Sequence, residues 1–201
     1  MSGRQPSLQQ EQCPEHLQAN RSALTRWLGR TVFGLMGWKL EGSIANAERV
    51  LIAVAPHTSN WDAVVGFAVI LGLNVRLHFL GKHTVFIPGL SWFMRWLGGI
   101  PVNRQNPEGV IDYVNQIVEK NDGVVIAVAP EGTRKKAKKW KTGFLRIAKI
   151  NDCKIQLGAF DFPSKRVVLG GIFEPTGDNY ADIETIKQWY RQYQGKFPDQ
   201  F

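Results

Sequence analysis

The types and spacing of His57 and Asp62 are suited to acid–base chemistry. Four residues separate the two side chains in the sequence. An imidazole titrates near neutral pH and can remove the proton of a hydroxyl group as that hydroxyl attacks. A carboxylate one helical turn further along can accept a hydrogen bond from one ring nitrogen, which fixes the tautomer and stabilises the imidazolium. The pair therefore predicts a general base oriented by a carboxylate.

A second group of polar residues has the types needed to bind and orient a substrate. Glu131 begins the run Glu-Gly-Thr-Arg, Arg104 ends the run Ile-Pro-Val-Asn-Arg, and Lys82 follows an apolar run. Guanidinium groups bind phosphate or carboxylate in a bidentate manner, and a glycine lets a ligand approach the backbone closely. The candidate substrate-binding residues are Arg104, Glu131, Gly132, Thr133, Arg134 and Lys82.

The pentapeptide Ile-Ala-Val-Ala-Pro occurs twice, at residues 52–56 and 126–130. Each copy ends an apolar run without alternation, which is typical of strands buried on both faces of a parallel sheet. Proline then ends each strand, because it has no backbone N–H to donate. His57 follows the first copy and Glu131 follows the second. Since open α/β sheets bind ligands at the carboxyl ends of their strands, we expect both residues at that edge.

The rest of the chain alternates between helix-like and strand-like segments. Helices are predicted over 63–73, 107–120, 142–150 and 183–195, and strands over 154–160 and 166–173. This alternation predicts one α/β domain over residues 21–201, with a mixed, largely parallel sheet covered by helices on both faces. Residues 1–20 are polar, rich in glutamine and aperiodic, so a mobile tail is expected there.

These motifs together resemble the glycerolipid acyltransferases of the 1-acylglycerol-3-phosphate (lysophosphatidic acid) acyltransferase type. That family carries His-x-x-x-x-Asp, then hydrophobic-Pro-x-x-Arg, then Glu-Gly-Thr-Arg. In this chain the three motifs appear in the same order, as His57–Asp62, Ile100–Arg104 and Glu131–Arg134. The similarity runs from about Trp38 to Phe162. The resemblance implies a fold like that of glycerol-3-phosphate acyltransferase.

The resemblance also implies an activity, the transfer of a fatty acyl group from a thioester to a hydroxyl of a lysophospholipid or glycerol-phosphate acceptor. The donor would be acyl-CoA or acyl-carrier protein, with no other cofactor. His57 would be the general base, oriented by Asp62. In the family, the residues matching Arg104 and Arg134 bind the acceptor's phosphate, and the residue matching Glu131 helps to hold the acceptor.

The sequence favours direct transfer of the acyl group, without an acyl-enzyme. The chain contains no Gly-x-Ser-x-Gly motif, and neither of its two cysteines adjoins a histidine. Ser59 lies inside the His57–Asp62 motif, but its simplest role is to cap the helix that comes after it. Metal-ligand spacing is also absent, so no metal is expected.

Basic residues are concentrated in one segment of the chain. The protein carries 25 Lys and Arg against 17 Asp and Glu, and residues 131–150 alone hold eight basic residues and one acid. Such a cluster attracts polyanions, and tryptophans beside basic residues are typical of membrane interfaces. Residues 21–38 are a candidate membrane-docking helix. The other predicted membrane or anionic contacts are Trp92, Trp96, Lys135, Lys136, Lys138 and Lys139.

Three alternatives stay open at this point. The segment 21–38 and the two tryptophans could instead pack on the core of the same domain. The family usually has prolines where this chain has Ile155–Phe160, so a lyso-aminolipid or glycolipid acceptor is an alternative. A basic nucleic-acid-binding or lipid-binding protein without catalysis belongs to a different class. Nucleic acid is not an expected partner, because no recognised motif accompanies the basic residues.

The composition also leads to an expected location. No apolar run reaches 18 residues, and the first residues lack the apolar segment of a secretory signal. We therefore predict a peripheral protein at the cytoplasmic face of a membrane, whose partners are a lipid acceptor, an acyl donor and an anionic membrane surface.

Overall fold

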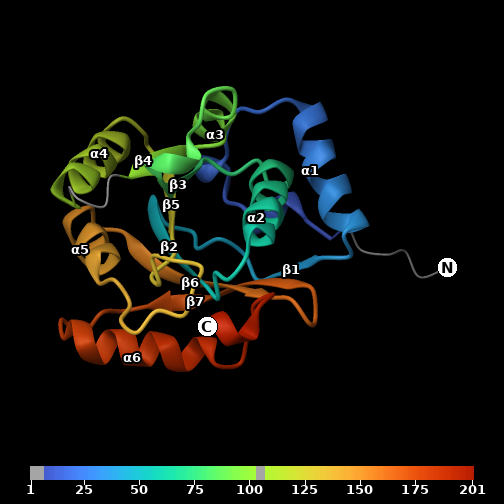
Figure 1. Cartoon of the computed structure of the whole chain (residues 1–201). Coiled ribbons are helices and arrows are strands. Elements are labelled where there is room, and N and C mark those ends of the chain that lie inside the picture. Colours follow the sequence, from blue (N-terminus) through green and yellow to red (C-terminus); the bar gives the residue numbers. More distant parts are fainter. Residues whose placement is uncertain (1–6, 103–106) are drawn as a thin grey trace.

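The seven strands of the domain form one sheet, shown in a computed structural model that describes residues 7–102 and 107–201 (Figure 1). The sheet order is β1-β7-β6-β2-β5-β3-β4, and only the β6–β7 pair is antiparallel. The strands are β1 (Lys39–Glu41), β2 (Arg49–Ala55), β3 (Leu77–Lys82), β4 (Gly99–Val102), β5 (Val124–Val128), β6 (Lys154–Asp161) and β7 (Arg166–Phe173).

Helices cover both faces of this sheet, and two separate cores result. One core joins the sheet to the N-terminal segment, α1 and α2, and the other joins it to α4, α5 and α6. The predicted α/β domain with helices on both faces is therefore confirmed. The helices are α1 (Ala23–Leu35), α2 (Asn60–Gly72), α3 (Ser91–Trp96), α4 (Pro107–Glu119), α5 (Gly143–Ile150) and α6 (Asn179–Tyr190).

Strand β2 shows why the repeated pentapeptide is apolar at every position. Leu51 and Ala53 face the core that includes α5 and α6, whereas Val50 and Ile52 face the core that includes α2. Alternate side chains of a strand point to opposite faces, so a central strand needs apolar residues on both. β5 pairs with β2 in parallel register, with Ile52 opposite Ala127. The two copies therefore end at the same edge of the sheet.

Residues 21–38 contain helix α1, which packs against the domain on one side. Gly29 lies directly against α2, because a Cβ there would come within 2.5 Å of the backbone nitrogen of Gly72. Phe33 is buried on the same side of α1. Other apolar side chains of the helix remain exposed, namely Leu24, Trp27, Leu28 and Leu35. One face of α1 thus packs on the domain, and another is left open to solvent.

The expectation of a mobile tail over residues 1–20 is wrong for the part that the structure describes. Leu8, Cys13 and Leu17 are buried in the core beside α1 and α2. The Gln12 side chain donates to the backbone oxygens of Leu40 and Gly42, which fastens the segment to the sheet. Leu17 lies in a 3-10 turn, Cys13 in extended backbone and Leu8 at a bend, so no helical or strand period reveals them. Residues 1–6 lie outside the described residues.

Candidate active site

His57 and Asp62 lie at the carboxyl edge of the sheet, where β2 passes into α2. Helix α2 begins at Asn60, with Ser59 as its N-cap: the Ser59 hydroxyl accepts a hydrogen bond from Trp61 N at 3.0 Å. The side chain of Asp62, in the first turn, returns toward the helix N-terminus and accepts from Ser59 N at 2.8 Å. Side chains of a helix point toward its N-terminus, which explains why a carboxylate five residues after His57 reaches back to it.

The two side chains contact one another directly. His57 Nδ1 lies 3.0 Å from Asp62 Oδ2, with the Asp62 side chain fully buried and the His57 side chain 23% exposed. A hydrogen bond at Nδ1 leaves the lone pair of the neutral imidazole on Nε2. Among the described residues, no hydrogen bond involves His57 Nε2. The geometry holds Nδ1 against a carboxylate and leaves the ring partly exposed, so the predicted contact between the two side chains is present.

Glu131 joins the end of β5 to the end of β2. Its Oε1 accepts a hydrogen bond from His57 N at 2.9 Å, and the residue is only 6% exposed. Burial raises the pKa of the Glu131 carboxyl to about 7, although the hydrogen bond from His57 N opposes this rise. Its second oxygen, Oε2, has no hydrogen-bond partner among the described residues. The meeting of His57 and Glu131 at one edge is confirmed, and the contact is made through the backbone of His57.

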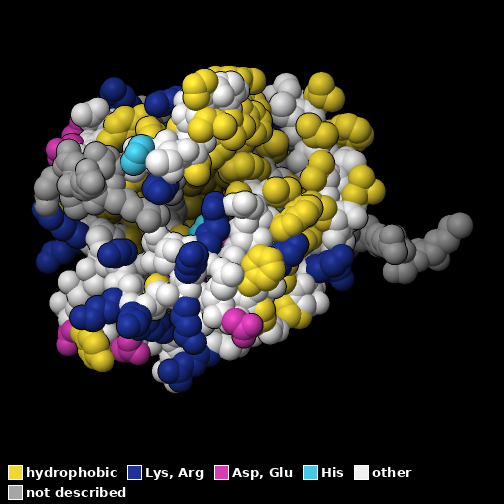
Figure 2. All heavy atoms as spheres, viewed as in Figure 1, with side chains coloured by type: hydrophobic (Ala, Val, Ile, Leu, Met, Phe, Trp, Pro, Cys, Tyr) yellow, Lys and Arg dark blue, Asp and Glu magenta, His cyan; other side chains and the backbone are white. Residues whose placement is uncertain are grey.

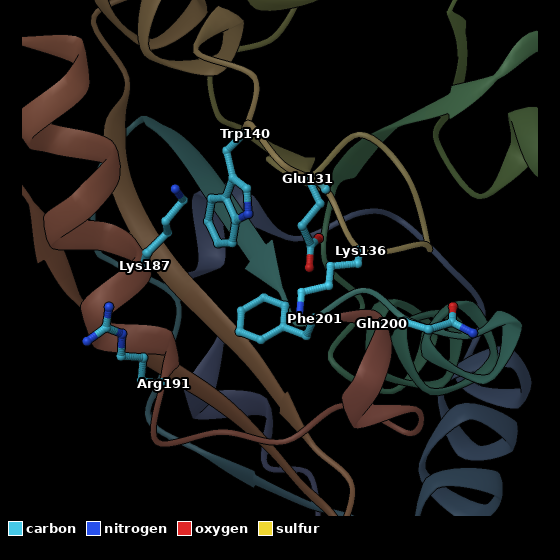
Figure 3. Close-up of a pocket in the computed structure, with 8 residues that line it drawn as sticks. Glu131, Lys136, Trp140, Lys187, Arg191, Gln200 and Phe201 are labelled. Carbon is cyan, nitrogen blue, oxygen red and sulfur yellow. The ribbon is translucent and has the colours of Figure 1, made fainter.

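A small pocket lies beside Glu131 (Figure 3). It has a volume of about 200 Å³, and its wall combines the loop after β5, the end of α6 and the last residues of the chain. The side chains of Glu131 and Lys136 are directed toward the same space, beside the rings of Trp140 and Phe201. The other lining residues are Ala137, Lys187, Arg191 and Gln200.

The remaining residues of the Glu131–Arg134 motif form a turn at the same edge. Gly132 has a φ of +65°, in the left-handed region that favours glycine, and its N–H donates to Ala129 O. Thr133 Oγ1 accepts from Lys135 N at 3.2 Å. Arg134 is exposed to solvent. Its guanidinium is therefore accessible to an anion.

Lys82, Arg104 and four lysines are the other residues predicted to contact substrate or anions. Lys82 is exposed at the carboxyl end of β3, which lies beside β5 in the sheet. β4 ends at Val102, and Arg104 lies outside the described residues. The four lysines of the basic segment are exposed: Lys135, Lys136, Lys138 and Lys139.

Hydrophobic and basic side chains occupy different parts of the face that carries the site. Figure 2 shows the face hollowed near its centre, with hydrophobic side chains gathered over α1 and α3 and with Lys and Arg side chains below the hollow. Trp92 is 68% exposed and Trp96 is 46% exposed, so neither is a core residue. The Arg21 guanidinium lies 5.8 Å from the centroid of the Trp96 ring, which brings the start of α1 to α3.

The described residues contain neither a cluster of metal ligands nor a membrane-spanning helix. No three His, Cys, Asp or Glu side chains among residues 7–102 and 107–201 come together as a metal site requires. Over the same residues, no helix has the length and hydropathy that crossing a bilayer demands.

The pattern of the sequence missed several residues near the site. Thr58 is 2% exposed, and its hydroxyl accepts from Phe197 N at 3.2 Å. Trp140, Gln200 and Phe201 line the pocket beside Glu131. No period or motif marks the last residues of the chain, because only the return of the chain after α6 brings them to this edge.

Comparison with known proteins identifies the family. The family model described as Acyltransferase matches residues 39–156, which contain all three motifs. A 1-acyl-sn-glycerol-3-phosphate acyltransferase of Streptococcus pneumoniae is 28% identical over 169 residues, which are 77% of this chain and 61% of that protein. The chloroplastic 1-acyl-sn-glycerol-3-phosphate acyltransferase LPAT1 of Arabidopsis thaliana is 30% identical over 84 residues, 41% of this chain and 24% of that protein.

A solved structure supports the same fold. The crystal structure of the 1-acyl-sn-glycerophosphate acyltransferase of Thermotoga maritima superposes with a TM-score of 0.55 at 21% identity, covering 84% of this chain and 78% of that one. This chain spans less than two thirds of the length of the two relatives from Streptococcus pneumoniae and Arabidopsis thaliana. The family model, however, covers more than half of this chain. The chain therefore belongs to the acyltransferase family.

Proposed function

We propose that the protein transfers a fatty acyl group from an acyl thioester, acyl-CoA or acyl-carrier protein, to a hydroxyl of a lysophospholipid or glycerol-phosphate acceptor. The observation that carries the proposal is the 3.0 Å contact between His57 Nδ1 and Asp62 Oδ2 at the carboxyl edge of the sheet. Together with the family membership, this contact supports His57 as the general base and Asp62 as the residue that orients it.

The proposed reaction begins with the acceptor hydroxyl beside His57 Nε2. The imidazole removes the hydroxyl proton as the oxygen attacks the thioester carbonyl, forming a tetrahedral intermediate. Asp62 stabilises the imidazolium through Nδ1. The C–S bond then breaks, and the proton on Nε2 passes to the departing thiolate. The products are an oxygen ester and a free thiol, so atoms and charge balance with only the two substrates and these side chains.

Direct transfer is supported by the state of the candidate nucleophiles. Burial raises the pKa of the Cys13 thiol to about 12 and that of Cys153 to about 11, which disfavours the thiolate of each. The Ser59 hydroxyl is occupied as an N-cap by Trp61 N. None of these three residues contacts the His57 ring among the described hydrogen bonds and ion pairs.

The anionic part of the acceptor is assigned to the basic groups at the same edge. Arg134 and Lys82 are exposed there, and Arg104 follows β4 in the sequence. We assign the acceptor phosphate to these cations, because charge-assisted bonds to phosphate are among the strongest polar contacts. Glu131, Gly132 and Thr133 complete the wall of the acceptor site.

A peripheral membrane location is also part of the proposal. Exposed apolar side chains on α1 and α3 border the hollow in this face, and basic side chains lie below it (Figure 2). Exposed tryptophans and leucines can enter the interface of a bilayer, while lysines are attracted to anionic headgroups. Docking by this face would present the site to substrates that are themselves part of the bilayer.

Co-sedimentation with anionic vesicles tests the docking face. We expect wild-type protein to bind at low salt and to dissociate as salt rises, because screening weakens the attraction between lysines and lipid. Trp27→Ala and Trp92→Ala should each weaken binding several-fold. Tyr180→Ala is the matched control, since Tyr180 is an exposed aromatic residue on α6. Equal binding by all four proteins, or no binding at low salt, would contradict the proposed docking face.

Release of free thiol from palmitoyl-CoA tests the reaction itself. A panel of lysophospholipids, glycerol 3-phosphate, a lyso-aminolipid and a lyso-glycolipid identifies the acceptor, and acyl-carrier protein replaces CoA in a parallel series. We expect acceptor-dependent release that His57→Ala reduces by at least about 10³-fold. His16→Ala is the matched control, because His16 is exposed and contacts Ala47 O, near the amino end of β2. Equal rates for wild type and His57→Ala would disprove the mechanism.

A further inference from the structure

The last seven residues of the chain, Gly195–Phe201, run across the loop that carries His57. We call this segment the strap. Its Phe197 N–H donates to Thr58 Oγ1 at 3.2 Å, and Thr58 directly follows His57 in the sequence. Thr58 is 2% exposed, so this hydrogen bond is shielded from water. The strap therefore contacts the residue next to the proposed general base.

Gly195 brings the backbone of the strap into direct contact with this loop. A Cβ placed on Gly195 would lie 2.6 Å from Thr58 Oγ1, 2.9 Å from Thr58 Cγ2 and 3.1 Å from Pro56 Cβ. Real Cβ atoms do not approach other atoms this closely, so a side chain here would push the loop or the strap away. Gly195 is buried, which leaves little free space for either to move.

The strap is fixed to the domain at several points around Thr58. The Lys196 ammonium lies 4.5 Å from the centroid of the Trp61 ring, on the first turn of α2. The Phe201 ring lies 5.9 Å from the Trp140 ring, beside the pocket that contains Glu131 (Figure 3). Just before the strap, Gln194 N donates to Asp161 Oδ1 at the end of β6.

The loop between β2 and α2 is thus held from three directions. His57 N donates to Glu131, at the end of β5, and Ser59 N donates to Asp62, inside α2. The third contact joins Thr58 to the strap. We propose that the strap positions the general base, with Thr58 and Gly195 as positioning residues that keep the His57 ring aligned with Asp62.

Burial of apolar surface accounts for only one end of the strap, where Phe201 packs against the core that includes α5 and α6. Residues 196–200 are all exposed, so they add little to either core. What the strap adds is a fixed position for Thr58. A displacement of about 1 Å in a catalytic group can lower the rate about 10²-fold, so a small shift of this loop would have a measurable effect.

Substitutions of Thr58 separate its hydrogen bond from its volume. Thr58→Val keeps the shape but removes the acceptor for Phe197 N–H, and Thr58→Ser keeps the acceptor. This proposal rests on the proposed acyl transfer, so the assay is thiol release with the acceptor found there. We expect Thr58→Val to lower kcat about 10-fold with KM within about twofold of wild type, and Thr58→Ser to restore kcat to within about twofold.

Variants of the strap test the same contact with Thr58 by changing the strap itself. Gly195→Ala should lower kcat about 10-fold or more, because its Cβ collides with Thr58. Gly171→Ala is the matched control, since a Cβ at that position on β7 meets nothing within 4 Å. Phe201→Ala removes the contact with Trp140 at the end of the chain, and a smaller loss of kcat, about threefold, is expected.

A second measurement does not depend on activity. In protein labelled with ¹⁵N-histidine, the NMR signals of the His57 ring report which nitrogen carries the proton. We expect the Nδ1–H tautomer in wild type, Thr58→Ser and Gly171→Ala, and a mixture of tautomers in Thr58→Val and Gly195→Ala.

The two measurements distinguish failure of this proposal from failure of the proposed function. Thr58→Val and Gly195→Ala that keep both the wild-type kcat and the Nδ1–H tautomer would overturn the positioning role. Tautomer mixing in those two variants, in a protein that shows no acyl transfer, would support the strap and contradict the proposed function. If Thr58→Val does not fold, Gly195→Ala and Phe201→Ala provide the test. Unchanged kcat and an unchanged His57 tautomer in both variants would also overturn the positioning role of the strap.

Discussion

The two copies of Ile-Ala-Val-Ala-Pro end side by side, but their next residues have opposite surroundings. His57, after the copy on β2, has a ring that is partly open to solvent and contacts Asp62. Glu131, after the copy on β5, is buried and uses one oxygen to bind the backbone of His57. The same strand sequence is therefore followed in one copy by a partly exposed imidazole and in the other by a buried carboxyl.

The difference comes from the segment that each residue leads into. After His57, the capping Ser59 starts α2 at once, and the first turn of that helix supplies Asp62. After Glu131, the chain makes a turn at Gly132 and begins no helix until Gly143. Residues of this loop and of the strap line one pocket with Glu131, and burial raises the pKa of the Glu131 carboxyl to about 7. The strand places a residue at the edge, and the next segment of the chain decides its chemistry.

The largest effect is expected from Asp62→Asn, which breaks the contact that distinguishes His57 from Glu131. An amide in place of the carboxylate can hold the imidazole in the wrong tautomer and no longer stabilises the imidazolium. We expect kcat to fall about 10³- to 10⁴-fold while the fold is retained. Initial rates of thiol release and a thermal midpoint measure the two quantities. Asp112→Asn, on the exposed face of α4, is the control, and activity of Asp62→Asn within about threefold of wild type would contradict this role.

Glu131→Gln tests whether the Glu131 carboxyl is desolvated, through the pH dependence of the free energy of unfolding. The ordinary pKa of this carboxyl is 4.5, and the folded value is about 7. Between these pH values the folded protein keeps a proton that the unfolded chain has lost, so wild-type stability falls as pH rises through the window. The loss is about 3 kcal/mol when complete. Glutamine keeps an acceptor for His57 N and does not titrate.

The free energy of unfolding of Glu131→Gln, relative to that of wild type, should therefore increase by about 3 kcal/mol between about pH 4 and about pH 8. Urea unfolding at a series of pH values measures this difference. Glu48→Gln, at an exposed position, should show no comparable change. A difference between Glu131→Gln and wild type that does not vary with pH would show that the carboxyl is not desolvated in the folded protein.

The smallest effect is expected from Ser59→Ala, which tests whether the N-cap of α2 contributes to the position of Asp62. Loss of an N-cap hydroxyl lowers stability by about 1 kcal/mol. Ser22 caps α1 by accepting from Thr25 N, so Ser22→Ala should cost a similar amount. Only Ser59→Ala should also reduce thiol release several-fold, because α2 carries Asp62 in its first turn. Equal rates of thiol release in Ser59→Ala and Ser22→Ala would show that the Ser59 cap does not contribute to catalysis.

Local sequence patterns were sufficient to predict four strands of the sheet, β2, β5, β6 and β7, and the contact at the centre of the site. Apolar runs predicted a strand ending at each pentapeptide, since strands buried on both faces must be apolar throughout. β2 ends at Ala55, directly before Pro56, and β5 ends at Val128, two residues before Pro130. The spacing from His57 to Asp62 predicted their contact, because both residues lie within one loop and one helical turn. Such short-range relations are expressed directly in sequence order.

Such patterns did not predict contacts between segments that are distant in the sequence. Leu8, Cys13 and Leu17 are buried through irregular backbone, which leaves no period in a segment rich in glutamine. The sequence alone placed His57 and Asp62 together and Glu131 beside them. Only the tertiary structure showed that Glu131 is buried and that the strap holds Thr58, since both depend on where the chain returns after α6, about 140 residues beyond His57.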